Sequence, residues 1–138
     1  MSIRVVSAFL CEKAGLGPDG KVWAAGVGIF GFASPKYPIE NFAAHLVFLT
    51  EADASEIGTT HKLNLELQNA DGKIGWHISA DLPITMESRK IAMAKQLVLT
   101  ITQPGVHQIV FKLNGKIAGI FPLEFLQAKS SLGTNDNG

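Results

Sequence analysis

The sequence predicts an all-β fold, a single antiparallel β-sandwich of roughly eight strands in an immunoglobulin-like or Greek-key arrangement. Apolar and polar residues alternate along several short segments, which is the pattern of half-buried strands. Glycine, proline and asparagine turns separate these segments. Helical signals are scarce: a capping-box spacing that begins at Asp53 is ended by Gly58 after about one turn. A parallel α/β fold would need a helix between successive strands, so the sandwich is favoured.

A first β-hairpin is expected over residues 63–80. Leucines at every second position from 63 to 67 alternate with polar residues. The pair Asp71 and Gly72 then supplies a turn, and residues 74–80 form the return strand.

A second hairpin is expected over residues 109–125, around Asn114 and Gly115. These two residue types tolerate the positive φ values that a two-residue hairpin turn requires. Because the turn fixes the register of its strands, we expect Asn114 and Gly115 to be structural determinants and not functional ones. The remaining expected strands are residues 3–11, 21–32, 42–50 and 97–101, while residues 88–96 could form a short helix or an extended crossover.

The length of 138 residues fits one domain. Hydrophobic residues make up 46% of the chain and charged residues 17%, so the chain can bury a core and intrinsic disorder is excluded. We expect a β-sandwich domain over residues 1–128. Residues 129–138 hold almost no apolar side chains, which predicts a flexible tail.

No stretch of the sequence approaches the roughly 20 apolar residues of a membrane-spanning helix. The apolar N-terminal segment, residues 2–11, is interrupted by Arg4 and lacks the pattern of a secretory signal. We therefore expect a cytoplasmic protein with no membrane span. A leaderless secreted protein or a phage component would share these features.

The balance of charges bears on the partners. The chain has 12 basic and 12 acidic residues, and the resulting net charge of zero argues against nucleic acid as a partner. The expected partner is another protein or a second copy of this chain, giving an oligomer. One cysteine excludes an internal disulfide and a cysteine-based zinc site. No cofactor is expected.

Residue types that carry chemistry are scattered. The acidic cluster from Glu51 to Glu56 has alanines where a calcium loop needs asparagine or glycine. Cys11 lies in an apolar strand and is expected to pack as a small hydrophobic residue. No helix follows the glycine-rich run over residues 26–31, so a dinucleotide fingerprint is rejected. The histidines fall on four separate expected strands without metal-ligand spacing: His45, His61, His77 and His107. We expect no catalytic, cofactor-binding or metal-binding residues.

Two places are candidates for an interaction. Tyr37 sits between two prolines on an expected exposed loop, where an aromatic side chain could stack on a partner. Trp23 and Trp76, in contrast, are expected to fill the core. The expected second strand has a face of small residues that would let another sheet approach, beside bulky apolar neighbours. Its candidate interaction residues are Ala24, Gly26, Gly28 and Phe30.

The chain also resembles a known family. The segments that carry the resemblance are residues 8–14, Asp19-Gly20-Lys21, the glycines at 26 and 28, Leu63-x-Leu65-x-Leu67, Asp71-Gly72, Pro104-Gly105 and Pro122-Leu123-x-Phe125. Together they resemble an uncharacterised bacterial family of short β-sandwich proteins, a domain of unknown function, over about residues 3–126. The resemblance implies a fold and a bacterial source but no activity. Where such proteins often place an aromatic residue after Pro-Gly, this chain has Val106 and His107.

The sequence therefore favours a non-enzymatic binding or assembly module that presents a sandwich edge or a loop to a protein partner. The alternative is a binder of a small apolar ligand or a carbohydrate that uses a pocket between the sheets. An enzyme is disfavoured, because no nucleophile, base and oxyanion donor can be grouped from the sequence.

Overall fold

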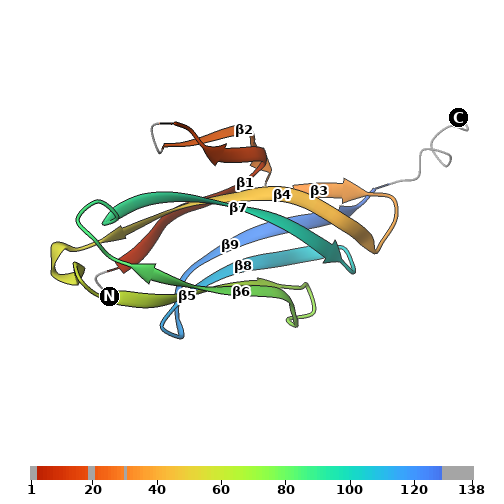
Figure 1. Ribbon diagram of the computed structural model, residues 1–138. Coiled ribbons are helices and arrows are strands. Elements are labelled where there is room, and N and C mark those ends of the chain that lie inside the picture. The colour runs from red at the N-terminus through yellow and green to blue at the C-terminus, as the bar shows by residue number, and fades with distance from the viewer. Residues whose placement is uncertain (1–2, 19–20, 30, 129–138) are drawn as a thin grey trace, which may run out of the picture.

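Two β-sheets pack face to face (Figure 1). The computed structural model describes residues 3–18, 21–29 and 31–128. In that part of the chain the sheets have the strand orders β2-β1-β4-β7 and β3-β9-β8-β5-β6, which confirms the predicted all-β sandwich. The first sheet consists of β1 (Ile3–Leu16), β2 (Val22–Ile29), β4 (Ile39–Ala52) and β7 (Lys90–Ile101). The second consists of β3 (Gly31–Ser34), β5 (Thr60–Gln68), β6 (Ile74–Pro83), β8 (Gly105–Leu113) and β9 (Lys116–Gln127).

The topology is of the Greek-key type. Strand β5 pairs with β6 on one side and with β8 on the other, although β7 lies between them in the chain and belongs to the opposite sheet. The order β9-β8-β5-β6 across from β4-β7 matches that of immunoglobulin variable domains. The described strand pairs are antiparallel except β3 with β9, which is parallel.

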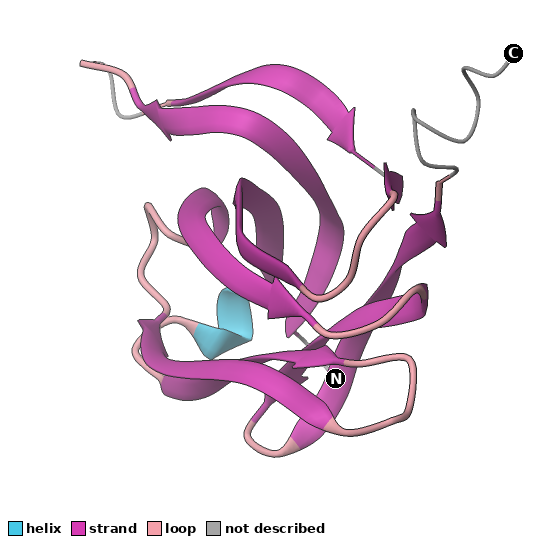
Figure 2. Ribbon diagram, turned by 90° about the vertical axis from the view of Figure 1, so that its right-hand side faces the viewer, coloured by secondary structure: helices cyan, strands magenta, loops and turns pink. Residues whose placement is uncertain are grey.

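Both predicted hairpins are confirmed. Strands β5 and β6 pair with Leu65 opposite Ile78, and β8 and β9 pair on either side of the predicted two-residue turn. In that turn φ is 52° at Asn114 and 85° at Gly115, the positive values that the sequence predicted. The short turn after Asp53 is a 3₁₀ turn, η1 (Ala54–Glu56), the helix in Figure 2.

Three expectations about the strands are corrected. Residues 88–96 form neither a helix nor a crossover, because β7 begins at Lys90 and runs through them. Residues 21–32 are not one strand: β2 and β3 lie in different sheets. Strand β1 continues past residue 11 to Leu16, and this last part pairs with β2 in a hairpin that stands away from the sandwich (Figures 1 and 2).

The core lies between the sheets and consists of the inward side chains predicted by the alternation. Phe48 and Phe111 pack across it with ring centroids 5.1 Å apart. Trp76 is half-buried against this core, but Trp23 is 50% exposed and its indole covers Gly15 on the projecting hairpin, which corrects its predicted core position. No helix in the described part of the chain is long and apolar enough to span a membrane.

The two sides of the sandwich end differently. On one side the edge strands are β6 and β7, and each pairs with a single neighbour among the described residues. On the other side β2 extends only the later part of β1, from Leu10, and β3 extends only the last part of β9, from Glu124. Each side holds an apolar cavity between the sheets, and these cavities are the candidates for a site.

Candidate binding site

The first candidate is a groove between β6 and β7, called here the β6–β7 groove. Its volume is about 430 Å³. Phe48, Leu63 and Leu65 form its floor, and all three are buried. The two edge strands supply its walls, which are apolar except for Asp81 on β6 and Lys95 on β7. The wall residues are Ile78, Ala80, Asp81, Leu82, Ile91, Ala92, Met93, Ala94 and Lys95.

Strand β7 presents a free backbone edge at this groove. Residues of an antiparallel strand direct their N–H and C=O groups alternately to either side. The Ala52 N–H donates to the Arg89 C=O at 2.7 Å, and the β4–β7 register runs from there without a shift to Phe42. Odd-numbered residues of β7 therefore bond to β4. Even-numbered residues, such as Ala92 and Ala94, direct their backbone groups outward.

Strand β6 presents a second free edge. The Ile84 N–H donates to the Thr59 C=O at 2.9 Å, so even-numbered residues of β6 bond to β5. Odd-numbered residues such as Ser79 then direct their backbone groups outward. Pro83, which has no N–H, occupies one of these outward positions at the end of the strand.

The two charged wall residues differ in their surroundings. The Asp81 carboxylate lies 3.2 Å from the Lys62 ammonium in a surface ion pair. Lys95 is exposed and forms no ion pair with any residue that the structure describes. The β6–β7 groove thus joins apolar walls, outward backbone donors and acceptors, and one uncompensated positive charge.

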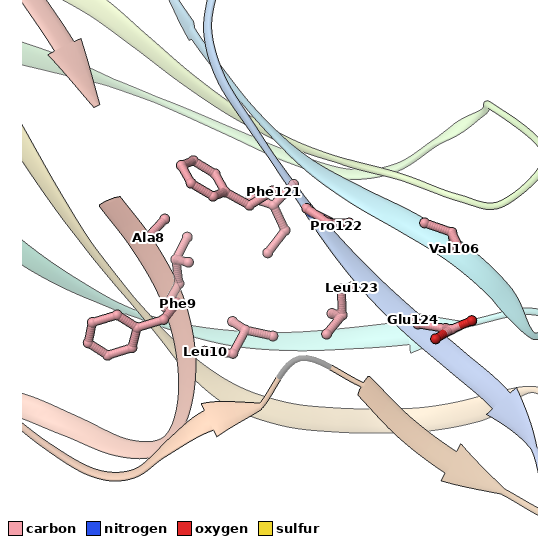
Figure 3. Close-up of a pocket in the computed structure, with 10 residues that line it drawn as sticks. Ala8, Phe9, Leu10, Val106, Phe121, Pro122, Leu123 and Glu124 are labelled. Atoms are coloured by element: carbon pink, nitrogen blue, oxygen red, sulfur yellow. The ribbon is translucent and has the colours of Figure 1, made fainter. Parts of the chain in front are cut away.

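The second candidate lies on the opposite side and is called here the β1–β9 cavity. Its volume is about 500 Å³. Leu10 extends towards Leu123 across the cavity, whereas the ring of Phe9 points away (Figure 3). Glu124 is the single charged residue among those that line it, and it lies at one end. The lining residues are Ala8, Phe9, Leu10, Leu46, Val106, Ile109, Phe121, Pro122, Leu123 and Glu124.

Tyr37 is half-buried, and its phenol is engaged. Its hydroxyl donates to the Leu126 carbonyl at 2.7 Å, which ties the loop before β4 to β9. Burial raises the pKa of the Tyr37 phenol. An interaction at Tyr37 stays a prediction, and it would use one face of a ring whose hydroxyl already has a partner.

The small-residue candidates lie on β2, in the projecting hairpin. Ala24 is half-buried and pairs with Ala14 on β1. Gly26 and Gly28 belong to β2, but their surroundings lie outside what the structure describes, and Phe30 lies outside the described residues altogether. Their role in an interaction stays a prediction.

The histidines lie on four strands, as the sequence predicted: β4, β5, β6 and β8. Within residues 3–18, 21–29 and 31–128 no three residues of the metal-ligating types come together. His107, expected at the surface or half-buried, is fully buried: its ring meets that of Phe125 edge to face at 5.0 Å, and Nδ1 lies 3.1 Å from the Gly105 carbonyl.

His61 forms a polar cluster that the sequence did not reveal. Its Nε2 lies 3.0 Å from a Glu56 carboxylate oxygen, and its Nδ1 lies 2.6 Å from Asn114 Nδ2. The Asn114 oxygen accepts the Lys62 N–H at 2.9 Å, so its amide nitrogen must face His61. The cluster fastens η1 to the β8–β9 turn. The Glu56 carboxylate and the Thr59 hydroxyl both contact Nε2 of His61. In a Ser-His-Asp type triad the hydroxyl and the carboxylate contact different ring nitrogens, so these residues do not form one.

Cys11 packs as the sequence predicted. It is fully buried, and its thiol donates to the Lys13 carbonyl at 3.3 Å. Burial raises the pKa of the Cys11 thiol, which disfavours the reactive thiolate.

A family model described as a family of unknown function, DUF6941, matches residues 6–125. The chain belongs to this family. That membership confirms the resemblance to a short domain of unknown function. No curated protein matches the sequence of this DUF6941 chain. Among solved structures it is similar to the Pseudomonas fluorescens alkylpurine DNA glycosylase AlkC bound to DNA containing an abasic site analog, with a TM-score of 0.53 and 11% identity. The match covers 90% of this chain and 30% of the glycosylase, and it shows the fold alone.

The exclusion of nucleic acid as a partner of the DUF6941 chain is corrected. The glycosylase that shares the fold is bound to DNA, so this type of sandwich occurs in a DNA-bound protein. The exclusion rested on a net charge of zero. Net charge is a sum over the chain and does not report how charges are distributed over its surface. It therefore cannot exclude a nucleic-acid partner.

Proposed function

We propose that this DUF6941 chain is a non-enzymatic binding module that takes an extended segment of a protein partner as an additional strand along β7. The observation that carries the proposal is the free edge of β7 beside the apolar β6–β7 groove. Outward N–H and C=O groups supply main-chain hydrogen bonds to an added strand, and a pocket beside the edge takes alternate side chains. Strand β7 has 12 residues and no proline, so the edge can accept a segment along its length.

The chemistry of the groove specifies the segment. Side chains at alternate positions would enter the space bounded by Ile78, Ile91 and Met93, so they are apolar. The uncompensated ammonium of Lys95 favours an acidic residue close to the middle of the segment. The groove walls offer two charged side chains and no paired nucleophile and base, which supports binding in place of catalysis.

The proposed setting is the cytoplasm of a bacterium. The one cysteine of the chain is buried and unpaired, which suits a reducing compartment. Imaging of the tagged chain in a bacterial cell, with markers for the cytoplasm and the envelope, tests this placement.

Proline substitution tests the proposal at the edge itself. In the Ala94→Pro variant an outward N–H is lost while the pairing of β7 with β4 is kept, because Ala94 does not bond to β4. The probe is an array of synthetic decapeptides with alternating apolar residues and either glutamate or lysine at the centre. We expect the glutamate peptides to bind better, and Ala94→Pro to weaken that binding by about tenfold or more.

Ser79→Pro is the matched control, because Ser79 holds the equivalent outward position on β6, across the same groove. It should leave peptide binding unchanged, and circular dichroism should show both variants folded. Equal binding by wild type and Ala94→Pro would overturn the proposal. Binding of a DNA duplex with an abasic site analog, with no response to any peptide, would also overturn it.

A further inference from the structure

The β1–β9 cavity is bounded by side chains that are buried but not fully packed. Leu10, Leu46 and Leu123 are each exposed by 3% or less, yet they face a shared space of about 500 Å³. Protein interiors are close-packed, and voids much larger than a water molecule are few. A volume of this size lies in the range of small-molecule binding sites, about 300–1,000 Å³. We infer that the β1–β9 cavity binds the hydrocarbon part of a small neutral amphiphile.

The walls select an apolar occupant. Ala8 and Leu10 on β1 face Phe121 and Leu123 on β9 across the cavity (Figure 3). Each of these side chains is a hydrocarbon, and Ile109 from β8 adds another. A polar ligand group among them would lose its hydrogen bonds to water without replacement, whereas a hydrocarbon chain loses none.

The β9 rim of the cavity mouth does not suit an added strand. The Ala128 N–H donates to the Ser34 carbonyl at 2.8 Å, so even-numbered residues on this stretch of β9 direct their backbone groups towards the β3 side. Strand β3 pairs only from Glu124 onward, which leaves Ile120 and Pro122 at a free edge among the described residues. Pro122 has no N–H to offer, so a strand cannot pair continuously here. A small molecule can enter.

The polar end of the ligand is restricted by charge. Glu124 is the single ionisable residue that lines the cavity, and it is exposed at one end. A carboxylate head group at this end would meet a like charge, whereas a neutral alcohol or amide would not. The inference concerns the side of the sandwich away from β7, so it does not depend on the proposed strand addition.

The experiment is an NMR titration of the isotope-labelled chain with 1-decanol and, separately, with decanoate. We expect 1-decanol to shift the amide signals of Leu10, Ile109 and Leu123 in a saturable way, and decanoate to bind at least tenfold more weakly. Glu124→Gln, an exposed substitution, should bring decanoate close to 1-decanol. Shifts confined to residues around the β6–β7 groove, or equal binding of both probes to wild type, would overturn the inference.

A filling substitution gives the second test. Ala8→Leu places a larger side chain in the cavity and should abolish 1-decanol binding. Ala43→Leu makes the same chemical change at an exposed position of β4 and should bind 1-decanol like wild type. Wild-type affinity in Ala8→Leu would overturn the inference. If Ala8→Leu does not fold, the inference is tested by comparing 1-decanol with decanoate binding in wild type and in Glu124→Gln.

Discussion

The β6–β7 groove and the β1–β9 cavity have similar volumes and apolar walls, but the strand edges beside them differ. At the β6–β7 groove, β7 offers an uninterrupted backbone edge with no proline, and Lys95 stands beside it. At the β1–β9 cavity, β3 covers the end of β9, and Pro122 removes a donor from the stretch left free. An apolar opening in a β-sandwich therefore does not define its ligand. The backbone at its rim determines where a strand can be added: along the uninterrupted edge of β7, but not continuously along β9.

The largest expected effect is a loss of folding stability, and it should be greater for a side chain packed in the core than for one that lines a cavity. Leu113 is fully buried and lines neither opening, so Leu113→Ala should lower the free energy of unfolding by about 3–5 kcal/mol. Leu123 already faces open space, and Leu123→Ala should cost about 2–3 kcal/mol because fewer contacts are lost. Urea denaturation measures both. Equal costs would show that the β1–β9 cavity is filled by packing in solution, which would remove the contrast.

A second effect concerns the turn that sets the register of β8 and β9, and hence which β9 side chains face the cavity. Gly115 has φ of 85°, and a Cβ added there meets no atom within 4 Å. The cost of Gly115→Val is therefore backbone strain alone, and it should lower stability by about 1–3 kcal/mol. Gly115→Asn, which tolerates positive φ, is the control and should cost less. An unchanged melting temperature for the valine variant would contradict the assigned turn.

A third effect concerns the hydrogen bond from Tyr37 to the end of β9 that pairs with β3. Tyr37→Phe removes the hydrogen bond to the Leu126 carbonyl and should lower stability by about 1 kcal/mol. The raised pKa of Tyr37 means that the unfolded chain releases the phenol proton first, so wild-type stability should fall as pH rises past the ordinary value of 10.0. The difference between wild type and Tyr37→Phe should then shrink above that pH. A constant difference across that range in chemical denaturation would contradict the assignment.

The smallest effect on stability is expected at Lys95, where substitution should instead change self-association. An inward-facing lysine on an edge strand discourages unwanted strand pairing. Lys95→Leu should change the free energy of unfolding by no more than about 0.5 kcal/mol, since the side chain is exposed, but sedimentation should show association that increases with concentration. Lys95→Arg keeps the charge and should sediment like wild type. A monomeric leucine variant would mean that the β7 edge is protected by some other feature.

Local sequence patterns predicted some parts of this fold and missed others, and Lys95 lies in one of the missed parts. Both hairpins were predictable because their alternation and turns are local. The later part of β7, residues 97–101, was predicted as a strand. Its first part was hidden because Lys95 interrupts the inward series Ile91 and Met93, and the alanines between them suit a helix equally well. The alternation Ile91-x-Met93 was the available signal for the groove. Both cavities depend on how far the sheets diverge, and the position of Trp23 depends on a hairpin leaving the sandwich. Neither property is encoded in a local pattern.

The parallel pair of β3 and β9 has a consequence for the order of folding during synthesis. The Gln127 side chain donates to the Ser34 carbonyl over a separation of 93 residues, and the two strands share no neighbour that brings them together earlier. Strand β3 therefore leaves the ribosome long before its partner exists. Because closing so long a loop is slow, completion of this sheet should be a late step, and a nascent chain stalled before β9 should expose the edge of β8.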